Sequence, residues 1–368
     1  MTTPDAPDLE SYADAREQAR FVENQELARK LRAVTAELGE VSNDRNRLAQ
    51  ENSALHAVQD AAVNLTPRPN WLEPRKANAK GKRRVTLVAD LSDLHAGEIV
   101  RPEEMGGFNA YNLRIADIRL KAFFANVVEL SRDWFAGVEY DGIVLPLGGD
   151  LVSGSIHDEL RETDELSVFD STLWVAERLL AGLEVWAEAF GTVHVVSVPG
   201  NHGRDQKIPR YKGRSAHNAD THIARMLAMS WKGSGVTFDI PETIDAGFEV
   251  YSTRFAMVHG EEYQKNNPGT SEIGSLGPVK RGTLRASRAK QAEGRPFDVN
   301  LVAHFHQRVY APDQGFVMNG SVKGYDEYAR GLSLKPEVPQ QVLFVVDPEH
   351  GPTIDAPIHL MDRKAEGW

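Results

Sequence analysis

The chain has 368 residues, a formal net charge of −11, 41% hydrophobic residues and no cysteine. The lack of cysteine excludes disulfides, thiolate metal sites and cysteine nucleophiles, and it is typical of a cytoplasmic protein. The acidic, polar N-terminus does not have the form of a secretory signal, and no run of about 20 apolar residues predicts a membrane span.

Three segments are expected before the catalytic domain. Residues 1–19 are polar and acidic, which predicts a disordered tail. Residues 20–60 carry a heptad pattern, which predicts a coiled coil. Residues 61–83 hold three prolines and a basic cluster, which is typical of a linker. The catalytic domain is then expected over residues 84–368.

The heptad pattern spaces apolar residues by alternating steps of four and three. Asn24, Arg45 and Asn52 fall at polar a positions within it, and a buried asparagine there favours two strands in register. We therefore expect a homo-oligomer through residues 24–58. The alternative is a single amphipathic helix packed on the catalytic domain. The apolar positions are Leu27, Leu31, Val34, Leu38, Val41, Leu48 and Leu55.

Beyond residue 84, short apolar runs alternate with longer helical patterns. Helical periodicity appears at 113–135, 168–190 and 220–231. Nearly continuous apolar strands separated by helices are typical of an α/β domain with covered sheets. His194, inside one strand, is expected to be a buried strand residue. The expected strands are 85–91, 143–149, 193–200, 254–260, 299–304 and 341–347.

Polar side chains follow five of these strands. In open α/β sheets, ligands bind outside the carboxyl ends of the strands, so the five sets can meet at one point. Carboxylates, a carboxamide and imidazoles without thiolates suit Mn, Fe, Zn or Mg, and seven donors suit two ions that share a bridging carboxylate. The alternative is a group of hydrogen-bonded histidines near a core. The sets are Asp93-Leu94-His95, Gly148-Gly149-Asp150, Gly200-Asn201-His202, Val258-His259-Gly260 and His304-Phe305-His306.

This series of motifs, from about Arg84 to at least His306, resembles the calcineurin-like metallophosphoesterase superfamily. The resemblance implies a four-layer α-β-β-α sandwich and two divalent ions, with manganese preferred and iron, zinc or magnesium as alternatives. It implies that His202 is a catalytic residue, which contacts the phosphoryl group or protonates the leaving oxygen. The implied ligands are Asp93, His95 and His306 for one metal, Asn201, His259 and His304 for the other, and Asp150 as the catalytic bridge.

Two departures from the family narrow the expected reaction. The stretch after Asp150 lacks the Asp and Arg of the family's protein phosphatases, and Gly203 stands where an acid usually follows the histidine. We therefore expect a phosphodiesterase or nuclease that acts on DNA or another nucleotide through a metal-bridging hydroxide, similar to the phage and DNA-repair-nuclease branch. The alternatives are a cyclic- or small-nucleotide phosphodiesterase, a phosphomonoesterase or protein phosphatase, and a catalytically degenerate coiled-coil assembly factor.

Two basic stretches, 204–214 and 280–290, flank the expected metal pair in sequence. Cations gathered beside the active centre of an acidic protein predict a polyanionic substrate such as nucleic acid, and solvated surface loops are the alternative. His157 either orients the substrate or is a helix N-terminal histidine without a special role. Residues 316–330 either form a loop over the site or complete the fold. The candidate substrate ligands of the first stretch are Arg204, Lys207, Arg210, Lys212 and Arg214.

Overall fold

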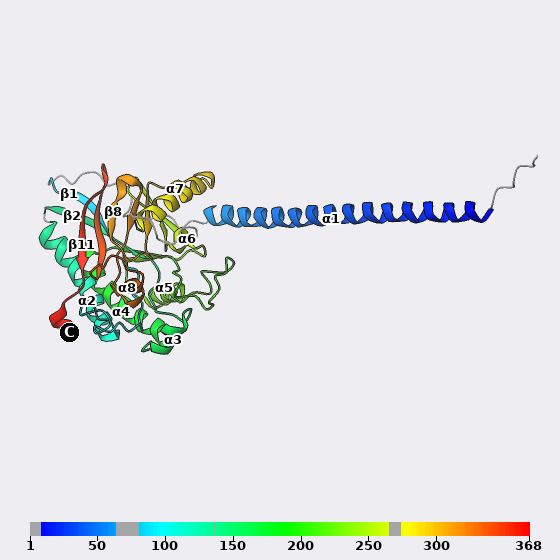
Figure 1. Ribbon diagram of the computed structural model, residues 1–368. Coiled ribbons are helices and arrows are strands. Elements are labelled where there is room, and N and C mark those ends of the chain that lie inside the picture. Colours follow the sequence, from blue (N-terminus) through cyan, green and yellow to red (C-terminus); the bar gives the residue numbers. More distant parts are fainter. Residues whose placement is uncertain (1–8, 64–80, 136, 265–273) are drawn as a thin grey trace, which may run out of the picture. The chain divides into compact units, whose positions relative to one another are not determined.

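The computed structural model describes residues 9–63, 81–135, 137–264 and 274–368, in two compact units that divide between residues 67 and 68. In its described part the first unit is one continuous helix, α1 (Leu9–Val63) (Figure 1). The helix begins within the stretch 1–19 where a disordered tail is expected, because residues 9–19 include Ala, Glu, Gln and Arg, which favour helix. It also ends inside the expected linker 61–83, of which residues 64–80 lie outside the described residues.

The second unit contains a six-stranded mixed sheet in the order β11-β10-β1-β2-β3-β4. The four strands β1 to β4 run parallel, while β10 and β11 are antiparallel to their neighbours. Leu87, Ile143 and Val193 pair across β1, β2 and β3, so one apolar row crosses the sheet. The strands are β1 (Arg83–Ala89), β2 (Val138–Leu147), β3 (Val193–Ser197), β4 (Val236–Asp239), β10 (Gln340–Asp347) and β11 (Gly351–His359).

A second mixed sheet has five strands in the order β5-β6-β7-β9-β8. Its three inner strands β6, β7 and β9 run parallel, and the edge strands β5 and β8 are antiparallel to them. Met257, Leu301 and Val317 pair across the inner strands. The strands are β5 (Asp245–Val250), β6 (Thr253–Val258), β7 (Val299–Val302), β8 (Val309–Ala311) and β9 (Phe316–Met318).

The helices of the second unit include the three expected from periodicity, although the first is shorter than expected. It ends at Glu129 and passes into a π-helix, so the 113–135 pattern spans two elements. The helical elements are α2 (Leu113–Glu129), η2 (Leu130–Trp134), α3 (Asp158–Thr163), α4 (Val168–Phe190), α5 (Ala219–Ser230), α6 (Glu261–Gln264), α7 (Leu276–Ala292), η3 (Pro312–Gln314), α8 (Glu327–Gly331) and α9 (Arg363–Glu366).

Helix α4 shows why these sequences form helices. Ser167 caps its N-terminus by accepting a hydrogen bond from the backbone N–H of Asp170 at 3.2 Å. Gly191 ends it with a φ of 72°, a conformation that glycine adopts without a steric cost. Leu179 and Leu183, four residues apart on one face, are fully buried. The helix is therefore fixed by both ends and by its apolar face.

Three apolar clusters place these elements in layers. In β1, Leu87 packs toward α2, α4 and α5, whereas Val88 packs between the two sheets, as the two-residue period of a strand dictates. On the outer face of the second sheet, Val279 of α7 packs against Val302 and Met318. Helices thus cover the outer faces of two sheets that share a core. Within the described ranges, every helix is too short or too polar to traverse a bilayer.

Candidate metal centre

The seven predicted ligands lie just beyond the carboxyl ends of β1, β2, β3, β6 and β7. Asp93 and His95 group with His306, and Asp150 groups with His259 and His304, with all ligand atoms of a group within 4.8 Å of one another. Since the strands of each sheet concerned run parallel, their carboxyl ends meet at one edge. The structure therefore brings together side chains from distant parts of the sequence, as expected.

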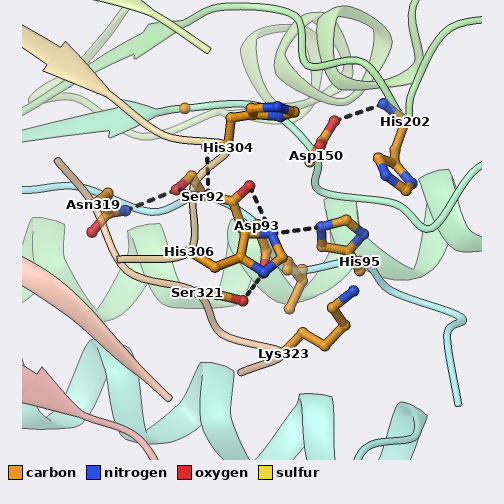
Figure 2. Close-up of polar contacts among 12 residues, drawn as sticks. Ser92, Asp93, His95, Asp150, His202, His304, His306, Asn319, Ser321 and Lys323 are labelled. Carbon is orange, nitrogen blue, oxygen red and sulfur yellow. Dashed lines mark hydrogen bonds and ion pairs between the residues drawn. The ribbon is translucent and has the colours of Figure 1, made fainter. Parts of the chain in front are cut away.

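The first group combines one carboxylate with two imidazoles. The Nε2 atoms of His95 and His306 face each other at 3.3 Å (Figure 2), and Nε2 of His306 lies 3.4 Å from Oδ1 of Asp93. The Asp93 oxygen is buried and has no hydrogen-bond partner among the described residues. Such a set of converging donors suits a cation that all three side chains can reach.

The second group is built around His259. Its Nε2 atom lies 3.0 Å from Oδ2 of Asp150 and 3.1 Å from Oδ1 of Asn201. The other ring nitrogen, Nδ1, lies 2.7 Å from the carbonyl oxygen of Gly148, so donation there leaves Nε2 as the ligand atom. Asp150 also shares a third close group with His95 and His202. It thus lies between the two sets, as a bridging carboxylate requires.

The backbone at these ligands is unusual. Seven described non-glycine residues have a positive φ between 50° and 70°, and five of them are predicted ligands. Non-glycine residues rarely adopt this conformation, and it concentrates at functional sites. These predicted ligands therefore lie in turns of left-handed backbone that follow their strands. The five are Asp93, His95, Asp150, His304 and His306.

Asp220, at the start of α5, joins two of these turns. Its carboxylate accepts hydrogen bonds from the backbone N–H groups of Asp150, Leu151 and Gly200 at 2.8–3.1 Å. The loops approach so closely that a Cβ on Gly200 would lie 2.2 Å from Oδ1 of Asp150. The glycine of the G-N-H motif is therefore required by the contact between loops.

Residues that follow β9 hold Asp93 in place through hydrogen bonds. Asn319 donates to Oγ of Ser92 at 2.9 Å, and Ser92 donates to Oδ2 of Asp93 at 2.6 Å (Figure 2). Ser321 donates to the carbonyl oxygen of Asp93 at 3.0 Å. Because Asn319 and Ser321 are buried, residues 319–326 form part of the folded core beside the site and help to position Asp93.

A buried ion-pair chain supports His95. Nζ of Lys323 lies 2.9 and 3.0 Å from the carboxylate oxygens of Glu98, and 2.6 Å from Oδ2 of Asp326. Glu98 in turn lies 3.3 Å from Nδ1 of His95. A carboxylate behind a ligand histidine fixes its ring orientation. Sequence reasoning missed Glu98 and Lys323, since nothing in the motifs distinguishes them from surface charges.

The electrostatics of the site follow from burial and close opposite charges. Burial lowers the pKa of His304 to about 3 and, together with Lys323 and His202, that of His95 to about 4. Burial also disfavours a charged His259, but Asp150 outweighs it and raises the pKa of His259 to about 10. Burial alone would raise the pKa of Asp150, but the nearby His259 and His202 hold it well below its usual range. The centre is therefore anionic at its carboxylates and suited to cations.

His202 lies beside the centre with one ring nitrogen engaged. Its Nδ1 atom lies 2.7 Å from the carbonyl oxygen of Ser153, and its backbone N–H donates to Oδ1 of Asp150 at 2.7 Å. A Cβ on Gly203 would lie 2.6 Å from Oδ1 of Asn218 and 3.0 Å from Oδ2 of Asp220. These two side chains leave no room for a side chain at residue 203. The carbonyl of Ser153 orients the His202 ring.

His157 caps the N-terminus of α3 and also faces the site. Its ring centre lies 5.4 Å from that of His202, which in turn lies 4.4 Å from that of His95. Burial and the nearby His202 and Arg204 lower the pKa of His157. The residue therefore precedes a helix and lies beside the histidines of the centre, and a role in orienting the substrate stays a prediction.

The basic stretch 204–214 divides into two kinds of residue. Arg204 donates to Glu261 at 3.0 Å, Lys207 pairs with Asp158, and the buried Arg214 pairs with Glu261 and Glu262. These three cations pair with acids of neighbouring segments, and their expected role in substrate binding stays a prediction.

Arg210 and Lys212 of the same stretch are exposed and have no ion-pair partner within the described ranges. The second basic stretch is the helix α7, which was not expected from the sequence. Its residues Arg281, Arg285 and Arg288 are exposed and share one face at helical spacing. In the described part of these two basic stretches, the exposed cations without an ion-pair partner therefore lie in one loop and along one helix.

The donor set fits divalent cations. Its oxygens and imidazoles are of the kind that manganese, iron and zinc accept. They converge in two groups that are linked because Asp150 also lies close to His95, and Asp93 offers a buried oxygen without a hydrogen bond from the described residues. A further group, Asp347, Glu349 and His350, is partly exposed. Arg83 pairs with its two acids, so this group is already compensated.

Comparison with known proteins finds likeness only among solved structures, and those described here have low sequence identity. No family model and no curated protein matches the chain. A conserved protein of Streptococcus pneumoniae TIGR4, described as a predicted phosphoesterase, is 12% identical, with a TM-score of 0.25 over 74% of this chain and 98% of its own. A dimetal phosphatase of Danio rerio is 10% identical, with a TM-score of 0.34 over 75% of this chain and 99% of its own. The function of this chain must therefore be inferred from its own residues.

Proposed function

We propose that this chain is a two-metal phosphoesterase, and more narrowly a phosphodiesterase that acts on DNA or another nucleotide. The observation that carries the proposal is the position of Asp150, which groups with His259 and His304 on one side and with His95, a member of the other group, on the other side. The two sheets with a common core and helices on their outer faces also support the four-layer α-β-β-α sandwich of the metallophosphoesterases.

In this proposal the ligands divide as the resemblance implies. Asp93, His95 and His306 hold one ion, and Asn201, His259 and His304 hold the second, with Asp150 between them. Manganese is the ion we propose, because mixed carboxylate and imidazole ligands suit it. When bound, such a pair lowers the pKa of water and stabilises charge on phosphoryl oxygens.

His202 has the position of a proton donor. With its Nδ1–H directed to the carbonyl of Ser153, its Nε2 atom is the nitrogen that can hold a proton for the leaving oxygen. The ring packs edge-on against the ligand His95, with 4.4 Å between ring centres. His202 therefore contributes to the reaction in this proposal without being needed to hold a metal.

Two features favour a diester over a monoester. Residues 151–157 contain no arginine or lysine to grip a dianionic monoester, and Arg204 nearby is occupied by Glu261. The exposed cations of α7, Arg281, Arg285 and Arg288, supply positive charge suited to a chain of phosphates. Their arrangement supports nucleic acid over a small nucleotide.

The test compares the parent with Asp150→Asn. With manganese, the parent should hydrolyse bis-p-nitrophenyl phosphate faster than p-nitrophenyl phosphate, and Asp150→Asn should lose at least about 100-fold in rate. Asp313→Asn, an exposed aspartate on η3, is the matched control and should keep the parent rate. Parent-like turnover in Asp150→Asn would refute the proposal, and a preference for the monoester would refute its narrower form.

A second comparison tests the substrate class. Reversing charge at Arg281, Arg285 and Arg288 should weaken cleavage of DNA and leave hydrolysis of the small diester unchanged. The control reverses three exposed lysines elsewhere in the second unit and should change neither. Equal cleavage of DNA by the two triple variants would favour a small-nucleotide substrate. The control residues are Lys232, Lys335 and Lys364.

A further inference from the structure

The apolar stripe of α1 is exposed in the single chain. Its described apolar a and d residues are all 51–69% exposed, although burying one such side chain contributes about 1.5–3 kcal/mol. A long exposed apolar stripe marks an interaction surface. We propose that this surface binds the same helix of a second copy of the chain, parallel and in register, as a two-stranded coiled coil. The stripe consists of Leu27, Leu31, Val34, Leu38, Val41 and Leu48.

The polar residues within the stripe select the parallel orientation. Parallel helices in register place each a residue opposite the same residue of the other helix. Asn24 then meets Asn24, and Asn52 meets Asn52, so that each amide can donate to and accept from its equivalent. The antiparallel arrangement that overlaps the whole stripe sets Asn52 opposite Leu27. A buried amide without a hydrogen-bond partner is unfavourable, so that orientation is disfavoured.

Arg45 is the cation within the stripe, and its neighbour supplies the opposite charge. In a parallel pair, an a residue packs into a hole lined by the preceding g residue of the facing helix. For Arg45 this residue is Asp44 of the second copy. Among the described residues of one chain, Asp44 pairs with Arg47 at 3.2 Å, with both side chains about two-thirds exposed. An exposed pair of this kind is weak, so Asp44 is available to the second helix.

The flanking positions agree with the same register. The g residues Glu37 and Asp44 face the small neutral e residues Ser42 and Ala49 of a parallel partner, so no like charges meet. In the antiparallel arrangement Glu37 faces Asp44 of the other helix, and like charges oppose. Packing, amide pairing and charge therefore all favour a second copy of the helix, bound parallel and in register.

Parallel pairing has a consequence for the second units. Both chains leave the coiled coil at the same end, so two candidate metal centres share one tether. Linking two binding sites makes the second binding event intramolecular, which can raise the overall affinity above that of either site. Two centres held in this way would bind a long polymer more tightly than either centre alone. This consequence concerns binding and does not depend on the hydrolytic step.

The cysteine-free sequence makes the register directly testable in the full-length protein. Leu38→Cys at an a position should form a disulfide-linked dimer under mild oxidation. Ala36→Cys, at the outward f position of the same turn, is the control and should stay unlinked. A mixture of Leu38→Cys and Val41→Cys that links faster than Leu38→Cys alone would indicate antiparallel helices and overturn the proposed orientation.

Sedimentation of the full-length protein tests association itself. The parent should sediment at twice the chain mass, and Leu31→Glu with Leu38→Glu should raise the dimer dissociation constant by at least about 100-fold through buried charge. Ala36→Glu introduces the same residue outside the stripe and should leave the dimer intact. A monomeric or tetrameric parent would overturn the proposal, whatever its hydrolytic activity.

Discussion

The carboxylate of Asp220 accepts a hydrogen bond from the backbone N–H of Asp150, with 3.1 Å between Oδ2 and N. The same side chain accepts from Leu151 and Gly200, so one buried acid holds the turns of two motifs. In Asp220→Asn an amide N–H would face one of these donors. We expect a loss of about 1–3 kcal/mol in unfolding free energy.

Metal content gives the second measurement for Asp220→Asn. Because the turn at Asp150 would no longer be fixed, we expect the variant to bind metal at least about tenfold more weakly, as residues that orient ligands typically do. Isothermal titration with Mn²⁺ and urea unfolding measure the two effects. Asp313→Asn provides the control, and a variant with parent affinity would show that Asp220 has no part in positioning the ligands.

Lys323 is expected to matter for stability as well as for His95. Its Nζ lies between Glu98 and Asp326, and all three side chains are buried. Lys323→Met leaves two carboxylates buried without their cation, which costs about 3–5 kcal/mol. Thermal unfolding measures this loss. The double variant Glu98→Gln with Lys323→Met should recover part of the lost stability. If the double variant were no more stable than Lys323→Met alone, the ion-pair explanation would be contradicted.

Removal of metal should affect the two ligand groups separately. Because ions bind only the folded chain, chelation should lower the melting temperature, by an amount equivalent to about 2.7 kcal/mol at a metal concentration 100 times the dissociation constant. We expect His306→Asn and His304→Asn each to retain one of two ions in elemental analysis. Loss of both ions in either variant would show that the groups do not act as separate sites.

His202 should be separable from metal binding. His202→Ala should keep two ions per chain and lose about 10²–10⁴-fold in kcat, as expected for a general acid. Single-turnover hydrolysis and elemental analysis distinguish these outcomes. Since His202 also lies within reach of His95 and Asp150, loss of an ion in His202→Ala would instead make it a ligand.

His194 is expected to make the fold sensitive to acid. It is buried in β3, its Nδ1 lies 2.8 Å from Oγ1 of Thr237, and burial lowers its pKa from 6.5 to about 4. Between these values the unfolded chain binds a proton that the folded chain does not. Stability from this group is therefore full above pH 6.5 and falls as the pH drops toward 4.

At pH 5 this effect amounts to about 2 kcal/mol, from 1.36 kcal/mol for each unit of pKa shift. His194→Gln should therefore lose less stability between pH 7 and pH 5 than the parent, measured by urea unfolding at both values. His350→Gln changes a histidine whose side chain is 64% exposed. Between pH 7 and pH 5 this variant should lose as much unfolding free energy as the parent. If His194→Gln lost as much stability as the parent, His194 would not be the source of the acid sensitivity.

The sequence predicted the strands that bear ligands because those strands are nearly continuous apolar runs. All six expected strands are present, from β1 to β10. The strands β8 and β9 have only three residues each, too few for a periodic pattern to be recognised. Helix α7 was missed because arginine and lysine alternate with small residues along it, and its apolar contacts are few.

The ligands could be predicted because each directly follows its strand, whereas their supports could not. Glu98, Asp220 and Lys323 become neighbours of the centre only through folding, and each stands in a stretch that reads as an ordinary polar turn or helix start. The neutralised arginines show the same limit. The sequence does not show that Glu261, two residues after His259 of the fourth motif, pairs with Arg204 and Arg214.

The left-handed backbone at the ligands has a consequence for variation of this chain. A glycine there would relax each turn and could gain about 0.5–1 kcal/mol locally, but it would delete the donor that the turn presents. At Asp93 or His306, substitutions that ease folding are thus the ones that abolish ion binding. Selection for thermal stability alone would therefore favour variants that no longer bind metal. Such a selection must also measure a property that depends on the metal, such as sensitivity to a chelator.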